Sequence, residues 1–302
     1  MRRASAIREL AAARNAPRIA AAFVERTIQV WDLRNSELLS EFDTVYDFGG
    51  GHRSALNPTG ELCVAAGWLK GMRGGVACYS GLTGVRLWHR TDIRQTLFVK
   101  FSCSGEFVWV GLYSGRFQKL DAGTGATVDQ FVSVGEVFDS PYSKLLLLAM
   151  RKRGYLLRGA KDSRIPNLSF GLLDVAFSPD RVCLTEAGGP VRCLDCQSGV
   201  EIWRYEPPRD THVLRLNYRP ADRNFYGVQW EYGHGTSRTL FRFADGGGRY
   251  EELCQLHSWY EEFCEDGDVL VTSVGEVISV AGGRIINQLM FPQKDYPDKI
   301  TV

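Results

Sequence analysis

Short apolar runs of strand length, separated by turns rich in Gly, Pro, Asp and Ser, follow one another along the chain. The clearest example is the stretch 181–206. Residues 182–186, 191–195 and 200–205 form three such runs, joined by short Gly-containing turns that are typical of β-hairpins. Residues 174–177 supply a fourth run just upstream. The pattern predicts a four-stranded antiparallel meander.

The meander is repeated. The same strand ending recurs at Trp31-Asp32, Tyr79-Ser80, Leu120-Asp121, Leu157-Arg158, Leu194-Asp195, Phe243-Ala244 and Val280-Ala281. The second residues of these pairs lie 37 to 49 residues apart, which is the period of propeller blades. The markers predict an all-β, seven-bladed β-propeller of four-stranded antiparallel blades, forming one domain over 1–302. The expected blades are 4–44, 45–91, 92–133, 134–170, 171–208, 209–258 and 259–298.

A second marker recurs in phase with the first. Each unit carries a turn between its first two strands, such as Asn57-Pro58-Thr59-Gly60 or Ser178-Pro179-Asp180. These residue types allow the chain to reverse, and Pro presets φ for a turn. Because two separate signals recur together, the repeat does not depend on either one alone.

Three segments resemble known propeller families. Residues 28–33, IQVWDL, resemble the strand ending of WD-repeat propellers, and residues 120–125 and 194–203 resemble the D-x-x-T-G-x-x-x-W repeat of PQQ-type propellers. The resemblance implies a propeller scaffold and does not specify an activity. In WD-repeat proteins an N-terminal strand completes the last blade, whereas the C-terminal unit here contains four candidate strands of its own. Residues 5–10 are expected to form the first strand of blade one, with a short helix over 5–14 as the alternative.

Composition adds few constraints. The net charge of +1 excludes a strong field toward nucleic acid or an acidic membrane, and no export signal or membrane-spanning segment is recognisable. The eight cysteines then favour reduced thiols in a cytoplasmic protein. Cys193 and Cys196 form a lone C-x-x-C, and because a zinc site needs four ligands we expect no metal site there. The run 151–153, Arg-Lys-Arg, is interpreted as a hairpin tip, since no basic stripe accompanies it.

In a propeller, the turns between second and third strands share one mouth with the segments that link successive blades. Exposed aromatic and Arg residues in these loops are the types that anchor protein interfaces. Each aromatic side chain taken alone is better explained by packing on a neighbouring blade. As a set, the loops predict a partner-binding face comprising Trp68, Lys70, Arg73, Tyr113, Arg151, Lys152, Arg153, Tyr232, His234, Arg238, Trp259 and Tyr260.

We therefore expect a non-enzymatic scaffold or accessory subunit that presents these loops to a protein partner. Nucleic acid and membrane partners are not favoured, and no catalytic residue, cofactor or metal is predicted. Two other classes stay open. One is an enzyme, either a quinone-dependent dehydrogenase implied by the PQQ-like repeats or a metal-dependent hydrolase using Asp47, Glu136 and Asp174. The other is a sugar or small-ligand binder. Trp88, Trp203 and Phe131 are expected to pack between blades.

Overall fold

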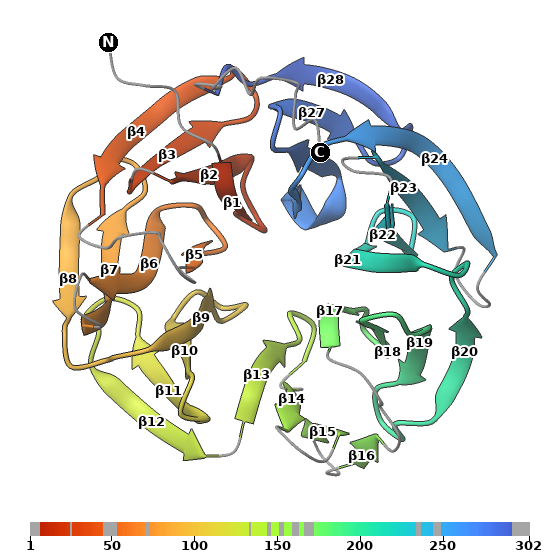
Figure 1. The fold of residues 1–302 in the computed structure, drawn as a ribbon, viewed down its shortest axis with the longest axis horizontal. Helices are drawn as coiled ribbons and strands as arrows, with labels where there is room; N and C mark the ends of the chain where they lie inside the picture. The colour runs from red at the N-terminus through yellow and green to blue at the C-terminus, as the bar shows by residue number, and fades with distance from the viewer. Residues whose placement is uncertain are drawn as a thin grey trace.

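Consecutive antiparallel strands form sheets that are arranged in a ring around a central axis (Figure 1). The computed structural model describes residues 7–24, 26–44, 53–69, 73–132, 134–143, 146–150, 154–158, 163–165, 172–233, 237–243 and 249–291. Within each sheet the strands follow chain order from the axis outward. The prediction of an all-β propeller of four-stranded antiparallel sheets is therefore confirmed.

The strands of the first half of the chain form three sheets. They are β1 Ile7–Ala12, β2 Arg18–Phe23, β3 Thr27–Asp32 and β4 Glu37–Asp43; β5 Arg53–Leu56, β6 Leu62–Leu69, β7 Arg73–Ser80 and β8 Arg86–Arg90; and β9 Thr96–Phe101, β10 Phe107–Leu112, β11 Arg116–Asp121 and β12 Thr127–Val132. The expectation of a strand near the N-terminus is confirmed by β1, and the helix considered as an alternative there is wrong.

The strands of the second half continue the ring. They are β13 Val134–Asp139, β14 Leu146–Met150, β15 Gly154–Arg158 and β16 Ser163–Ile165; β17 Leu172–Phe177, β18 Arg181–Glu186, β19 Val191–Asp195 and β20 Glu201–Tyr205; β21 Thr211–Arg219, β22 Asn224–Glu231, β23 Ser237–Phe243 and β24 Tyr250–His257; and β25 Glu261–Cys264, β26 Val269–Thr272, β27 Glu276–Ser279 and β28 Arg284–Gln288. A 3-10 turn, η1 Glu265–Gly267, joins β25 to β26.

The prediction of seven equivalent blades requires correction, because only six of the sheets are regular blades. The fourth sheet, β13–β16, ends in an outer strand of three residues that pairs with β15 at three positions, whereas the other outer strands have five to eight. In two of the regular blades the turn before the outer strand is capped. The Asp121 carboxylate accepts hydrogen bonds from the N–H and hydroxyl of Thr124, and Asp195 accepts the same pair from Ser198. Arg158 stands at this position in the fourth sheet.

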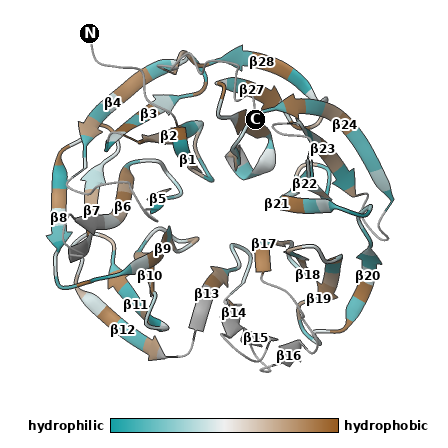
Figure 2. Ribbon diagram, in the orientation of Figure 1, coloured by the Kyte–Doolittle hydropathy of each residue, from teal (hydrophilic) through white to brown (hydrophobic). Residues whose placement is uncertain are grey.

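The hydrophobic core lies between neighbouring sheets, each apolar cluster being shared by two of them. Phe42 of the first sheet stacks on Tyr79 of the second, with ring centroids 4.7 Å apart. Apolar and polar residues alternate along the outermost strands, consistent with one face packed and the other in solvent (Figure 2). Since no sheet could bury its faces alone, the ring is the unit of stability.

Indole side chains of outermost strands reach the next sheet, as the sequence predicts. The Trp88 Nε1–H donates to the Ala122 carbonyl at 2.8 Å, and the Trp203 ring lies 5.1 Å from that of Phe243. The indole of Trp88 also covers Gly125, where φ is +71° and an added Cβ would lie 2.7 Å from the ring. Phe131 contacts the Phe117 ring of its own sheet and packs against a buried cluster that also contains Val137 of the next sheet.

Ring closure uses side chains and loops instead of a shared sheet, since β1–β4 and β25–β28 each come from one end of the chain. The Arg14 guanidinium pairs with Asp266 at 2.7 Å, and the Asp266 N–H donates to the Arg14 carbonyl. Trp31 packs edge-on against Phe291 within a buried cluster common to the two sheets. No latch strand like that of WD-repeat proteins is present among the described residues.

Candidate interaction face

The turns of the fifth to seventh sheets meet at one end of the ring. The Arg238 guanidinium, at the start of β23, donates to the carbonyls of Ser258 and Trp259 in the segment between β24 and β25. The N–H of Trp259 in turn donates to Ser273 Oγ in the β26–β27 turn, at 3.1 Å. These contacts join the start of β23 to residues 258–260 and to the β26–β27 turn. We call this end of the ring the aromatic mouth, defined by the β22–β23 turn, residues 258–260 and the β26–β27 turn.

Large aromatic side chains are exposed at the aromatic mouth. The exposed fractions of Tyr232, Trp259 and Tyr260 are 69%, 60% and 38%. Tyr232 packs edge-on against Trp230, which stacks on His212 with centroids 5.9 Å apart. The His212 Nδ1 accepts the N–H of Gly188 from the β18–β19 turn, which extends the patch to the fifth sheet. The exposed rings therefore lie on the β22–β23 turn and on residues 258–260.

A buried ion pair supports this surface from beneath. Arg238 Nε lies 2.7 Å from Glu261 Oε1, and the two side chains are 7% and 2% exposed. The Ser258 hydroxyl donates to the same carboxylate. Burial raises the pKa of Glu261, and the charge of Arg238 and the Ser258 hydrogen bond oppose that shift. Arg238 thus fixes the segment that carries Trp259 and Tyr260.

Arg238 is therefore not in the loop where the sequence analysis places it. It is the second residue of β23, opposite Leu256 of β24, and its guanidinium is buried. Trp68 and Arg73 also lie in strands, because β6 extends to Leu69 and β7 begins at Arg73. Long strands continue here beyond the point where polar and Gly residues suggest that they end.

The other predicted contact residues are distributed differently. Tyr113 lies at the β10–β11 turn and is 42% exposed, with its N–H donating to the Gln95 carbonyl. Lys70, Arg151, Lys152, Arg153 and His234 lie outside the described residues. The structure thus brings together Tyr232, Arg238, Trp259 and Tyr260. Sequence analysis did not identify Trp230, His212 and Glu261, whose positions inside strand runs gave no reason to separate them from the core.

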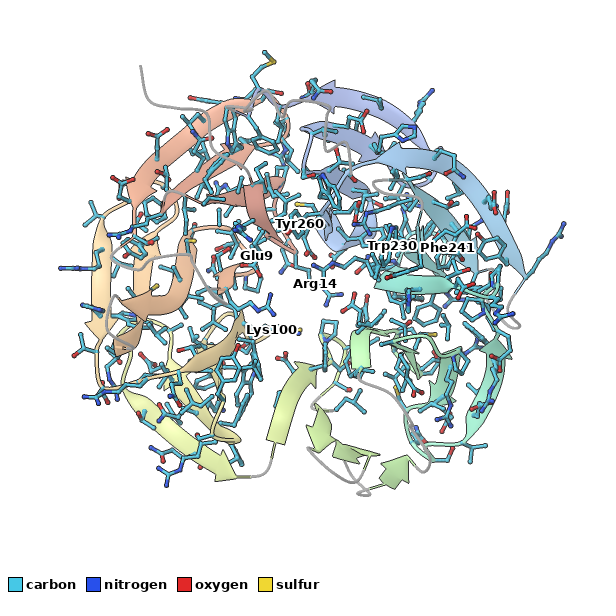
Figure 3. The ribbon with its side chains drawn as sticks, viewed as in Figure 1. Glu9, Arg14, Lys100, Trp230, Phe241 and Tyr260 are labelled. Carbon is cyan, nitrogen blue, oxygen red and sulfur yellow. The ribbon has the colours of Figure 1, made fainter. Side chains whose placement is uncertain are left out.

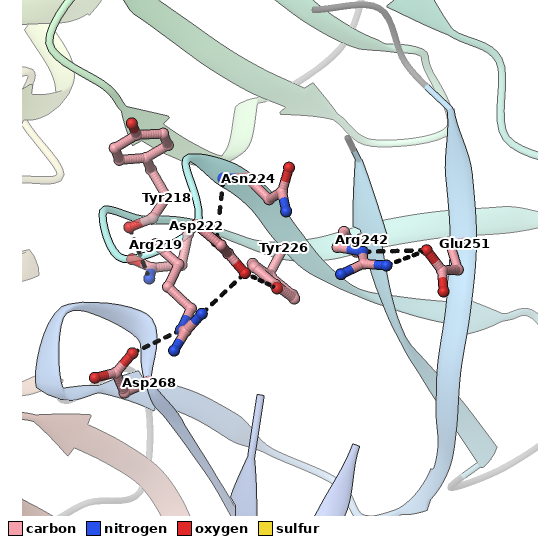
Figure 4. Close-up of polar contacts among 9 residues, drawn as sticks. Tyr218, Arg219, Asp222, Asn224, Tyr226, Arg242, Glu251 and Asp268 are labelled. Carbon is pink, nitrogen blue, oxygen red and sulfur yellow. Dashed lines mark hydrogen bonds and ion pairs between the residues drawn. The ribbon is translucent and has the colours of Figure 1, made fainter. Parts of the chain in front are cut away.

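The opposite end of the ring, the turn mouth, is defined by the β1–β2, β21–β22 and β25–β26 turns. Its polar side chains are bonded to one another (Figure 4). Arg219 pairs with Asp222 at 2.9 Å and with Asp268 of the next sheet at 2.6 Å. The Tyr226 hydroxyl also donates to Asp222. Burial raises the pKa of Asp222, but the hydrogen bonds from Tyr226 and Arg219 outweigh it and hold the value below its usual range.

The residues considered for metal-dependent hydrolysis do not form a ligand set in the described part of the chain. The Asp174 carboxylate accepts the Leu216 N–H at 2.8 Å, Asp47 lies outside the described residues, and the side chain of Glu136 is not described. Within these limits, no three His, Cys, Asp or Glu residues are close enough to share an ion. Cys193 is buried in β19 and Cys196 lies in the following turn, both as free thiols.

Comparisons with known proteins show the fold. No protein-family model matches the chain, and no curated protein matches it. The solved structure of U3-55K, a WD-repeat propeller, is similar with a TM-score of 0.68 at 10% identity, over 89% of this chain and 88% of that one. Since 1664 solved chains match, the likeness does not separate one function from another. The described residues include no helix long and apolar enough to cross a membrane. The chain thus has a β-propeller fold similar to that of U3-55K.

Proposed function

We propose that this protein is a non-enzymatic interaction scaffold that binds a protein partner through its aromatic mouth. The observation that carries the proposal is the exposure of Tyr232, Trp259 and Tyr260 at the ends of rigid strands. Aromatic residues are enriched among the side chains that dominate interface energies, particularly where neighbouring groups exclude water. The propeller likeness agrees with a scaffold role, since WD-repeat propellers are generally non-enzymatic.

The support beneath the patch is consistent with recognition. A buried charge pair is costly to desolvate, and it is stable here because Arg238 also donates to two backbone carbonyls. That arrangement holds the 258–260 segment before a partner arrives, which reduces the entropy lost on binding. We infer that the partner contacts the ends of the sixth and seventh sheets and is a protein.

The test is binding of the double variant Tyr232→Ala/Trp259→Ala. A partner is first isolated by affinity purification with the unaltered chain, and its binding is then measured with both purified components. We expect affinity to fall by about 2 kcal/mol or more, or at least roughly thirtyfold. The matched control is Val200→Ala/Ile202→Ala, which removes exposed apolar side chains from the outer strand region of the fifth sheet. Equal binding by both double variants would place the interface elsewhere.

Tyr113→Ala tests how far the interface extends. Tyr113 lies in the third sheet and is exposed, so its side chain contributes only if the partner spans the ring. A loss confined to Tyr232→Ala/Trp259→Ala would restrict the interface to the sixth and seventh sheets. The predicted residues Trp68, Lys70, Arg73, Arg151, Lys152, Arg153 and His234 remain candidates for a wider contact.

A further inference from the structure

The axis of the ring contains a cavity lined by charged side chains. It has a volume of about 590 Å³ and is walled by β1, β5, β9, β17, β21 and β25. A smaller cavity of about 170 Å³ lies along the same axis toward the turn mouth, and Lys100 lines both. Figure 3 shows Glu9, Arg14 and Lys100 at the centre of the ring. A cavity of the larger volume is in the range that holds a small organic ligand.

Local strand geometry directs charges to this cavity. Three innermost strands each change register against the adjacent strand. The shift comes just before Glu9 in β1, Asp174 in β17 and Arg215 in β21. Such bulges re-aim a side chain and recur next to functional sites. All three residues line the larger cavity. Three sheets therefore use the same irregularity at the same place to present a charged group to the axis.

The carboxylates of the wall are largely engaged by neighbouring sheets. Glu9 accepts the Ser54 N–H at 2.5 Å and also its hydroxyl, and Asp174 accepts the Leu216 N–H. Glu262 lies 3.5 Å from the Arg215 guanidinium. In the smaller cavity Asp139 accepts the Cys103 N–H at 2.6 Å. These carboxylates bond to groups of neighbouring sheets. Because their oxygens already accept hydrogen bonds or pair with Arg215, they are poorly placed to bind a cationic ligand.

The cationic groups line the same cavity. The Arg53 side chain is 51% exposed, donates through Nε to the Leu97 carbonyl and lies 3.8 Å from Glu9. The Lys100 ammonium, which comes from the next sheet, lies 3.9 Å from the centroid of the Phe138 ring. Arg215 donates to the Glu261 carbonyl and pairs with Glu262. Three cationic side chains therefore face one cavity from three sheets.

The wall of the larger cavity also carries three carboxylates, those of Glu9, Asp174 and Glu262, opposite these three cations. Burial raises the pKa of Glu9, Asp139 and Asp174, and it raises the pKa of Glu262 to about 7, although nearby cations oppose each shift. Near neutral pH Glu262 is thus partly protonated while the guanidinium groups remain charged. This protonation lowers the negative charge of the wall that would repel an anion.

We propose that the axial cavity binds a small soluble anion bearing a phosphate or carboxylate group, held by Arg53 and Lys100 with Arg215 behind them. Guanidinium groups match the planar, bidentate geometry of both anions, and an ammonium supplies a point charge. The protein wall around the cavity strengthens these contacts relative to open solvent. This site is separate from the protein interface proposed above and does not depend on it.

The experiment is calorimetric titration of the full chain with sulfate, pyrophosphate and citrate in turn. Sulfate is the reference probe because its charge is constant across neutral pH, and the other two separate phosphate from carboxylate preference. We expect saturable binding of at least one probe at a single site. Lys100→Met and Arg53→Met should each weaken it about tenfold or more. The matched control Arg209→Met, which alters an arginine 97% exposed outside the cavity, should leave it unchanged.

Glu262→Gln gives a readout that a damaged fold would not mimic. Because the change removes a negative charge from the wall, sulfate should bind more tightly, and its affinity should depend less on pH between about 6 and 8. In the unaltered chain the affinity should fall as pH rises over that interval. Absence of saturable binding by all three probes, equal weakening by Arg209→Met, or weaker binding by Glu262→Gln would overturn the proposal.

Discussion

The two mouths of the ring use similar residues for different purposes. At the turn mouth, Arg219 and Arg14 bond to acidic side chains of adjoining sheets, so the polar groups are satisfied within the chain. At the aromatic mouth, the Arg238–Glu261 pair is buried, and the side chains above it, such as Trp259, face solvent. Charge pairs join neighbouring sheets at both mouths, but at the aromatic mouth the pair lies buried beneath exposed aromatic side chains.

The contrast shows that exposure and support are separable. The exposed aromatic rings at the aromatic mouth should contribute little to the free energy of unfolding. The contacts that fix the backbone of the 258–260 segment come from Arg238 and Ser273. At the turn mouth the exposed and bonded groups are the same residues. Substitutions should therefore affect folding at one mouth and recognition at the other, except at the buried pair, where both depend on the same atoms.

The largest effect is expected from Glu261→Ala, which should lower stability at the aromatic mouth, where the other substitutions are expected to affect recognition. Removing the carboxylate leaves the Arg238 guanidinium buried without its partner, so the free energy of unfolding should fall by about 3–5 kcal/mol. Urea denaturation measures the change. The control is Glu251→Ala, which removes the partner of Arg242 at a site where the carboxylate is 51% exposed, and should cost less than about 1 kcal/mol. Equal losses of unfolding free energy in Glu261→Ala and Glu251→Ala would show that burial of the ion pair does not determine the cost of breaking it.

The axial wall between the mouths should make stability depend on pH. The pKa of Glu262 in the fold is about 7 against an ordinary 4.5, so the folded state binds more protons than the unfolded state between these values. The free energy of unfolding should therefore fall as pH rises, with Glu262 contributing about 2 kcal/mol of the loss between roughly pH 5 and 7.5. Denaturation of Glu262→Gln at both pH values should show a smaller difference. An unchanged slope would contradict the assignment.

At the turn mouth, Asp222→Ala should cost about 1–2 kcal/mol, because it removes an acceptor shared by Arg219, Tyr226 and the Asn224 N–H. The pKa of Asp222 is held below its usual value, so its stabilisation is present above that value and is lost as pH falls through the lowered one. Thermal unfolding near neutral pH and in acid tests both parts. A variant whose deficit persists unchanged in acid would contradict the role of the ionised carboxylate.

The smallest change in stability is expected at the exposed surface of the aromatic mouth. Tyr232→Ala should alter the free energy of unfolding by no more than about 0.5 kcal/mol, as is usual for exposed positions, while partner binding falls. Urea denaturation beside the binding assay measures both. A marked loss of stability would show that Tyr232 supports Trp230, and the separation between support and exposure would then fail at this residue.

Much of the architecture follows from sequence because hairpin turns and strand runs are local signals. The strand ending at Leu194-Asp195 and the turn after it could be recognised from a few residues, and the structure places them in β19 and its turn. The regularity of the blades could not be inferred equally well. The outer strand β16 pairs with β15 at only three positions, a shortening that the recurring sequence markers did not indicate.

The candidate site was predictable only in outline. Trp259 and Tyr232 could be assigned to one mouth because propeller topology dictates which loops meet. Arg238 was misplaced because the polar run at the start of β23 resembles a loop, and its burial depends on Glu261 from another sheet. The charged axis was missed for a similar reason. Glu9 and Arg215 are ordinary charged residues in sequence, and the bulges that direct them inward arise from pairing register.

Every sheet of this ring consists of consecutive residues, including the first and the last. A growing polypeptide emerging from a ribosome can therefore complete each meander before the next is made, at the usual synthesis rate of about 5–20 residues per second. The seam at Arg14 and Asp266 can form only after the final meander has been synthesised. Until then the apolar flank that will receive Cys264 and Val271 is uncovered, and this interval is when a nascent chain would most need a chaperone.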